Sequence, residues 1–247
     1  MVERLLKFGL CYIGYGVELT VFIALACHGR WKRLPNLFVY LALLFTVDGA
    51  GRMYALYRFG QQSAKYSYFY WLTDDLLALA AFGLVCSFFR RACHDKKELW
   101  HSIRFFLLWV FVLAVLGTTF SLHRNFKHLH FDRFVTEFEQ NLYFSCLVLN
   151  TLLYIIMQYI GNKDDELNLL VCGMGIQFAG PAASLAFSVL TPGGHPLSLF
   201  SYVDQLCFLG MLLVWAYAVV RVPKTASIRA ASEQVQPLAE AAIRRAA

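Results

Sequence analysis

The chain alternates between long apolar segments and short polar connections along almost its whole length. A helix needs about 20 mostly apolar residues to cross the hydrocarbon core of a bilayer. Seven segments meet this requirement, and they cover residues 5–27, 36–58, 69–91, 102–121, 139–161, 168–190 and 199–221. The pattern therefore predicts an all-α fold: a polytopic membrane protein with a bundle of seven transmembrane helices.

These segments leave little of the chain for a separate soluble domain. We expect residues 1–222 to form one transmembrane domain and residues 223–247 to form a short tail. The composition agrees, because 59% of the 247 residues are hydrophobic and 15% are charged, against ~45–50% and ~25% in soluble domains. The seven cysteines contain no CxxC pair, which favours small, buried, reduced thiols over a disulfide scaffold.

The distribution of lysine and arginine predicts how the bundle is oriented. Thirteen of them flank one side of the segments and seven flank the other, with Arg52 and Arg104 left out because they lie inside segments. Loops that are richer in Lys and Arg stay in the cytoplasm. We therefore expect an outer N-terminus and a cytoplasmic C-terminus in the inner (plasma) membrane. The net charge of +6 is spread over these connections and does not form the basic groove of a nucleic-acid binder.

Several ionisable side chains fall inside the apolar segments, where each costs at least ~2.5–3.5 kcal/mol on insertion scales. Asp48 and Arg52 are four residues apart, so they share one helical face and can pair. Glu18 also lies within a segment, and Glu139 lies at the rim of another. Residues of this kind usually face the bundle interior, where they pair with one another or serve a function.

Most of these polar positions map to the outer half of the predicted bundle when depth is counted at ~1.5 Å per residue. We expect them to line a polar cavity that opens outward and binds a small polar ligand or a cation. The candidate ligand-binding residues are Asp48, Arg52, Asp74, Asp75, Gln140, Gln177, Asp204 and Gln205. The alternative is structural, because interhelical polar contacts also hold membrane helices together.

A histidine-rich stretch between the fourth and fifth segments offers weak metal-ligand candidates. They are His123, His128, His130 and Asp132. Imidazole and carboxylate groups suit zinc, copper or nickel, but no single regular structure brings all three histidines together. Arg124 and Lys127 also oppose a cation there. A solvated interfacial loop is the alternative, and we assign no metal site.

The motifs of the common membrane chemistries are missing from the sequence. Apart from Lys7 at the start of the first segment, no segment holds the lysine that a retinal Schiff base needs. The patterns HExxH, GxSxG and GxGxxG and the P-loop are absent as well. We therefore expect no cofactor and no catalytic residues, and the sequence favours a protein that is not an enzyme.

Four stretches carry a resemblance to a known group of proteins. They are HGRWKRLP at 28–35, YFYWLTDD at 68–75, FEQNL at 138–142 and YVDQL at 202–206. In these stretches and in its layout the chain resembles a family of seven-helix membrane proteins found in acidobacterial genomes. That resemblance implies a bacterial membrane protein with no assigned activity and no functional residues to carry over. The layout is also similar to the membrane sensing modules that precede bacterial signalling domains.

Three functions remain open at this stage. The first is a sensor-like or ligand-binding module that passes a signal to a cytoplasmic or membrane protein partner. The second is an accessory or scaffold subunit, whose apolar fourth segment would face lipid or a partner helix. The third is a small ion- or proton-coupled transporter that uses Asp48 and Glu18 as protonation sites. The lack of an internal repeat weighs against the transporter.

Overall fold

The structure is a computed structural model that describes residues 2–27, 30–60, 62–94, 96–124, 131–161, 164–190 and 203–220. Helices fill these ranges, and no strand occurs in them. The elements are α1 (Val2–Cys27), the short 3-10 helix η1 (Arg30–Lys32), α2 (Pro35–Leu44), the π-helix η2 (Phe45–Gly51), α3 (Arg52–Phe59), α4 (Ala64–Ala92), α5 (Lys97–Arg124), α6 (Phe131–Ile160), α7 (Asp165–Leu190) and a last helix, Val203–Val220. The helical fold class is therefore confirmed.

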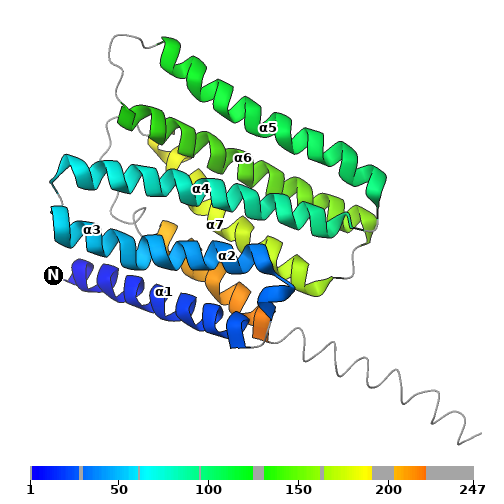
Figure 1. Cartoon of the computed structure of the whole chain (residues 1–247), viewed down its shortest axis with the longest axis horizontal. Coiled ribbons are helices and arrows are strands. Elements are labelled where there is room, and N and C mark those ends of the chain that lie inside the picture. Colours follow the sequence, from blue (N-terminus) through cyan, green and yellow to red (C-terminus); the bar gives the residue numbers. More distant parts are fainter. Residues whose placement is uncertain are drawn as a thin grey trace, which may run out of the picture.

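The elements α2, η2 and α3 follow one another without a break, so the described ranges contain seven helical rods apart from η1. Each rod coincides with most of one of the seven predicted apolar segments. Figure 1 shows that successive rods alternate in direction, so that the connections gather at the two ends of the bundle. The end that carries the connections α1–α2, α4–α5 and α6–α7 is called the basic end below, because the sequence places most Lys and Arg there.

Five rods are long and apolar enough to cross a membrane. They are Pro35–Phe59, Ala64–Ala92, Glu98–Phe120, Phe134–Ile160 and Val203–Val220. In the first rod the apolar stretch Tyr12–Cys27 is shorter. These helices support a membrane-embedded protein. The predicted seven-span topology, its orientation and the tail after residue 222 stay predictions, and the tail lies outside the described residues.

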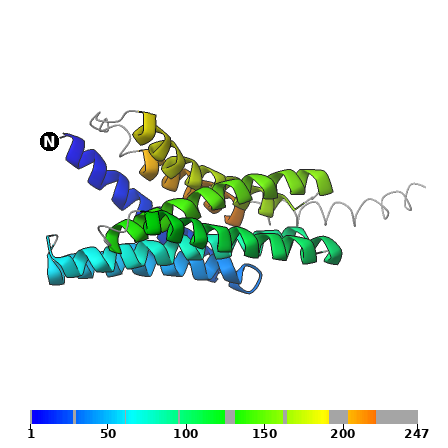
Figure 2. The same cartoon turned by 90° about the horizontal axis from the view of Figure 1, so that it is seen from above.

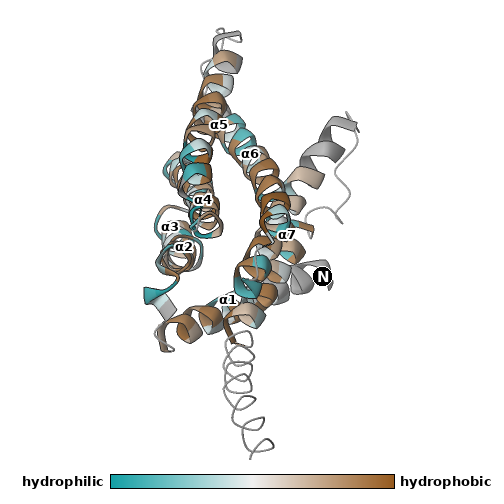
Figure 3. Cartoon of the chain, turned by 90° about the vertical axis from the view of Figure 1, so that its right-hand side faces the viewer, coloured by the Kyte–Doolittle hydropathy of each residue, from teal (hydrophilic) through white to brown (hydrophobic). Residues whose placement is uncertain are grey.

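The helix α6 occupies a central position in the bundle, because it packs against α4, α5 and α7. The helix α5 lies at the edge and packs mainly on α6 (Figures 1 and 3). Large apolar side chains on α5, among them Phe105, Leu108 and Trp109, are exposed. This agrees with the prediction that the fourth segment faces lipid or a partner. Seen from above in Figure 2, α1 is inclined to α4.

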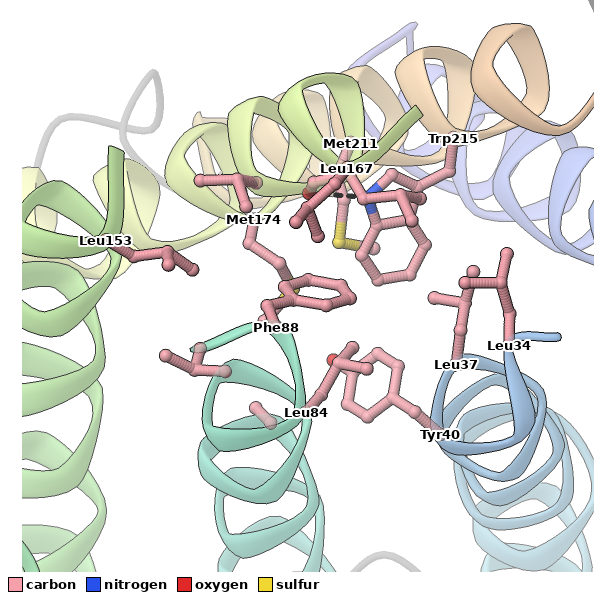
Figure 4. Close-up of a cluster of buried hydrophobic side chains, with 14 of the residues drawn as sticks. Leu34, Leu37, Tyr40, Leu84, Phe88, Leu153, Leu167, Met174, Met211 and Trp215 are labelled. Atoms are coloured by element: carbon pink, nitrogen blue, oxygen red, sulfur yellow. Dashed lines mark hydrogen bonds between the residues drawn. The ribbon is translucent and has the colours of Figure 1, made fainter. Parts of the chain in front are cut away.

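The space between the ribbons near the basic end, visible in Figure 3, is filled by apolar side chains. Figure 4 shows that Tyr40, Phe88, Met174 and Trp215 converge there from four different helices. The indole Nε1 of Trp215 donates a hydrogen bond to the carbonyl oxygen of Leu170 at 3.0 Å. An apolar plug therefore closes this half of the bundle.

Glycine allows the close contact between α7 and the last helix. A Cβ atom at Gly173 would lie 2.6 Å from Nε1 of Trp215, and one at Gly180 would lie 2.9 Å from Oδ1 of Asp204. At Gly210 a Cβ atom would come within 3.3 Å of Ile176. Small residues that bring backbones together are typical of helix pairs in membranes. The core around Trp215 depends on this approach.

The described cysteines are free, as expected. Cys93 and Cys146 are buried, but Cys27 and Cys172 are exposed, so the prediction of buried thiols is wrong for these two. Their positions on helices that face outward explain the difference, because a thiol is apolar enough to face lipid as well as a core. At the end of α4, burial raises the pKa of the Cys93 thiol, while Lys96 acts in the opposite direction.

Candidate functional site

Arg52 links two segments of the chain by ion pairs inside the bundle. Its Nη1 donates to Oδ1 of Asp48 at 2.7 Å, and its Nη2 donates to Oδ1 of Asp74 on α4. The ring of Tyr70 lies against the guanidinium, with Cζ of Arg52 4.2 Å from the ring centroid. Such cation–π contacts gain strength when the cation is removed from water. The pair of Asp48 and Arg52 predicted from their spacing is therefore confirmed.

The π-helix η2 carries Asp48 into this position. The backbone N–H of Arg52 reaches the carbonyl oxygen of Val47, five residues earlier, which is the π pattern. The Thr46 hydroxyl donates to the carbonyl oxygens of Ala42 and Leu43 at 2.8 and 3.1 Å, which helps the backbone to depart from α geometry. Short π segments occur frequently at functional sites.

Further carboxyl groups approach Arg52 from other helices. Glu139 of α6 interacts electrostatically with Asp74, Asp75 and Arg52. One oxygen of Asp75, Oδ1, is buried, and no hydrogen-bond partner for it occurs among the described residues. Neighbouring residues on a helix point in directions about 100° apart, and of these two aspartates only Asp74 is seen to pair with Arg52.

The helix α1 contributes Glu18, for which no partner could be assigned from the sequence. Its side chain is 0% exposed, and neither carboxyl oxygen has a hydrogen-bond partner in the described part of the chain. It interacts electrostatically with Asp48. One turn earlier on α1, the Tyr15 hydroxyl donates to the backbone carbonyl of Asp48 at 3.2 Å. The structure thus places Glu18 beside the η2 segment.

We name this group the Arg52 cluster, and its members come from four of the seven rods. They are Glu18, Asp48, Arg52, Tyr70, Asp74, Asp75 and Glu139. The cluster contains five carboxyl groups and one guanidinium. After Arg52 has paired with two of the carboxylates, three remain without a basic partner within the cluster. Such an excess of acidic groups attracts cations or protons.

The structure places the other predicted site residues elsewhere. Asp204 lies at the contact between the last helix and α7, against Gly180. The side-chain oxygens of Gln177 and Gln205 are buried and have no hydrogen-bond partner among the described residues. Gln140 lines a groove between α5 and α6. These four residues are therefore not seen to join the cluster, and the outward opening of a cavity there stays a prediction.

The candidate metal ligands are residues that the structure does not describe, or whose side chains it does not describe. His128 and His130 lie in the undescribed stretch, and the side chains of His123 and Asp132 are not described either. Within the described ranges, no group of three or more His, Cys, Asp or Glu side chains is arranged to hold a metal ion.

A second ionic cluster lies at the basic end, and the sequence analysis did not find it. Arg91 of α4 contacts Asp164 and Glu166 at the start of α7, with its Nη2 2.7 Å from an oxygen of each carboxylate. Arg33 reaches the same oxygen of Glu166 at 3.3 Å. Glu166 is 2% exposed, although it follows a short connection. This cluster joins the α1–α2 connection, α4 and α7 beside the apolar plug.

A weak signal for that cluster was present in the sequence. Asp164, Asp165 and Glu166 form an acidic run at the start of a segment on the side that is otherwise rich in Lys and Arg. Acidic residues favour the first turn of a helix because its dipole is positive there. That local explanation gave no reason to look for a basic partner more than 70 residues away.

Comparison with known proteins identifies no relative of the chain. No protein-family model, no curated protein and no solved structure matches the chain. The resemblance to acidobacterial seven-helix proteins therefore stays a prediction.

Proposed function

We propose that the protein is a sensor-like membrane module that binds a small monovalent cation at the Arg52 cluster, in competition with protons. One observation carries the proposal: the carboxyl group of Glu18 is fully buried beside Asp48 and has no hydrogen-bond partner among the described residues. A buried carboxylate without a partner is strongly unfavourable. A cation or a proton that neutralises Glu18 removes this penalty.

The charge of the cluster supports a cation over an anion. Arg52 already contacts Asp48 and Asp74, so its positive charge is neutralised. An anion would have to enter a group in which carboxyl groups outnumber the guanidinium five to one. Of the three carboxyl groups that Arg52 is not seen to contact, Glu18 is the one that is fully buried, and a single positive charge beside it is enough to neutralise it. A divalent ion would need six or more oxygen ligands.

The position of the cluster supports a role in signalling. Its members sit on α1, on η2 and α3, on α4 and on α6, so that a change in occupancy acts on four rods at once. A ligand shifts a conformational equilibrium by its difference in affinity for the two states. The α4–α5 connection at the basic end would pass such a shift to a protein partner.

A thermal-stability experiment tests the proposal. We expect Na⁺ to raise the melting temperature of the purified protein above that in choline chloride of equal ionic strength. Ligand at 100 times Kd stabilises by about 2.7 kcal/mol, which corresponds to roughly 5–10 °C for a chain of this size. In the Glu18→Gln variant the Na⁺ effect should disappear, while the stability without Na⁺ stays equal or rises because a buried charge has been removed.

Two variants serve as controls for this experiment. Glu98→Gln removes an exposed carboxylate at the start of α5 and should leave the Na⁺ effect unchanged. Arg52→Gln removes the ion pairs with Asp48 and Asp74, of which only the second joins two rods. If the cluster only joins helices, Na⁺ has no specific effect on the original protein or Glu18→Gln leaves that effect unchanged, and the proposal is then wrong.

We also propose the seven-span topology, with the N-terminus outside and the C-terminus in the cytoplasm. The seven rods alternate in direction, which supports an odd number of crossings (Figure 1). A fluorescent protein that folds only in the cytoplasm, fused after residue 247, should be bright in a bacterial host. The same protein fused after residue 62, in the α3–α4 connection, should be dark. The opposite result would reverse the orientation.

The role as an accessory subunit is the second candidate, and the exposed side of α5 favours it. Phe105, Leu108, Trp109 and Leu113 are 46–62% exposed on this edge helix. A partner helix can cover such a face as well as lipid can. Co-purification of one polypeptide in a fixed ratio, together with no effect of Na⁺ on stability, would favour this role.

The transporter remains a third proposal, and it needs the basic end to open. Glu18 and Asp48 would serve as its ion or proton sites, but the apolar plug and the Arg91 contacts close the bundle on the basic side. Alternating access would require the side chains of the apolar plug to move apart and the Arg91 ion pairs to break. Flux of Na⁺ or protons through reconstituted protein would favour this role over the sensor.

A further inference from the structure

Tyr40 of α2 carries a polar group into the buried interior of the bundle. Its side chain is 5% exposed and packs among the apolar side chains of the plug (Figure 4). No hydrogen bond of its hydroxyl is seen among the described residues. A buried tyrosine hydroxyl usually finds a partner, and leaving it without one costs free energy. We therefore expect a partner other than a protein group next to this hydroxyl.

The position of Tyr40 relates this hydroxyl to the Arg52 cluster. Tyr40 precedes Asp48 by eight residues on the same rod, which is about two helical turns and brings both residues to one side of it. Tyr40 interacts electrostatically with Asp48 and with Glu18, the fully buried carboxyl group of α1.

The hydroxyl of Tyr40 does not bond directly to Glu18, because neither carboxyl oxygen of Glu18 has a hydrogen-bond partner among the described residues. Two buried oxygen groups are thus neighbours, and each is without a partner. A cation that lies between two oxygen atoms contacts both and holds them further apart than a direct hydrogen bond does. Glu18 and Tyr40 are therefore placed as two ligands of one ion.

A phenol oxygen is suited to this role. It is neutral at ordinary pH and has two lone pairs that can accept, so it adds an oxygen ligand without adding charge. The charge of one monovalent cation is then balanced by the carboxylate of Glu18 alone. Hard cations take oxygen ligands of exactly these kinds, from carboxylate and neutral groups together.

The ring of Tyr40 contacts the centre of the apolar plug. It packs edge-on against Trp215, with the ring centroids 5.9 Å apart and the planes at 74°. Trp215 is fully buried and donates its hydrogen bond to the carbonyl oxygen of Leu170 on α7. Since protein interiors are closely packed, a movement of the Tyr40 ring has to displace Trp215.

We propose that the Tyr40 hydroxyl is a second ligand of the monovalent cation beside Glu18, and that the Tyr40 ring passes the occupancy of this site to Trp215 in the apolar plug. The inference rests on the proposed function, and it adds how the cation is held and how its binding reaches α7 and the last helix.

The variant Tyr40→Phe tests this inference, because it removes the oxygen and keeps the ring. We expect the Kd for radiolabelled Na⁺ to rise about tenfold or more, as when a polar contact to a charged group is lost. The melting temperature in choline chloride should stay equal or rise, because an unpartnered buried hydroxyl has been removed. In a background that keeps Trp215 as the sole tryptophan, saturating Na⁺ should change the fluorescence, and Tyr40→Phe should reduce this change at least twofold.

Tyr57→Phe is the matched control, since it makes the same chemical change on the same rod. Tyr57 is 91% exposed, and its variant should keep the Kd for Na⁺ and the fluorescence change of the original protein. A Kd for Tyr40→Phe within twofold of the original would overturn the inference and leave the proposed function standing. Bound Na⁺ without any change at Trp215 would overturn the route to the plug. If the original protein binds no Na⁺, the proposed function itself is wrong, and this inference is rejected with it.

Discussion

Replacing Arg91 by alanine is expected to destabilise the folded protein by about 3–5 kcal/mol, because it leaves a buried carboxylate without its main partner. Glu166 is 2% exposed and is 2.7 Å from Nη2 of Arg91. The other basic neighbour, Arg33, is 3.3 Å away and its side chain is 62% exposed, so it compensates only in part. Thermal or denaturant unfolding in detergent measures the change.

The neighbouring residue supplies the control for the Arg91 variant. Arg90 lies on the same turn of α4 and is exposed, and Arg90→Ala should change the stability by less than about 0.5 kcal/mol. The combination Arg91→Ala with Glu166→Gln should recover part of the loss, because the uncompensated charge is then gone. Equal effects of Arg91→Ala and Arg90→Ala would mean that the contacts at the basic end do not stabilise the fold.

Gly173→Ala is the second substitution with a large expected effect, at about 3 kcal/mol of lost stability. The added Cβ atom would lie 2.6 Å from Nε1 of Trp215, so the indole must move. The movement breaks its hydrogen bond to Leu170 and disturbs the plug that Figure 4 shows. Trp215 is fully buried, and therefore little space exists for it to shift.

Gly83→Ala is the matched control, since it makes the same chemical change on another predicted span. No atom lies within 4 Å of a Cβ atom there. Alanine favours helix over glycine by roughly 0.5–1 kcal/mol, so this variant should be as stable as the original protein or slightly more so. If Gly173→Ala changes the stability as little as Gly83→Ala does, α7 and the last helix do not pack closely at Gly173.

The helices were predictable because length and apolar content are local properties of the sequence. The starts of some helices were not. The helix α6 begins at Phe131 and α4 begins at Ala64, earlier than the predicted 139 and 69. Their first turns mix charged or polar residues with apolar ones, so that hydropathy alone does not locate the start of the helix. At α4, Oγ of Ser63 accepts a hydrogen bond from the backbone N–H of Lys65 as an N-cap.

The site was predictable where it depends on spacing within one helix. The pair of Asp48 and Arg52 follows from their separation of four residues. The choice of Asp74 as the second partner of Arg52, and the approach of Glu18 to Asp48, depend on how whole helices are rotated about their axes. Hydrophobic periodicity defines that rotation poorly in helices that are apolar on most sides.

The contact of Arg91 with Glu166 could not be derived from the sequence for a similar reason. The two residues are 75 positions apart and lie next to connections, where charged side chains are usually solvated. Only the packing of α7 beside α4 buries Glu166 and turns two loop charges into an internal pair.

Direct binding of radiolabelled Na⁺ to the purified protein tests the central claim, that the Arg52 cluster takes up a monovalent cation through Glu18. A scintillation proximity assay at alkaline pH counts the ions bound per chain. We predict one Na⁺ per chain, released as the pH is lowered, absent in Glu18→Gln and retained in Glu98→Gln. No bound Na⁺ in the original protein, or undiminished binding in Glu18→Gln, would contradict the claim and leave the cluster as a structural link between helices.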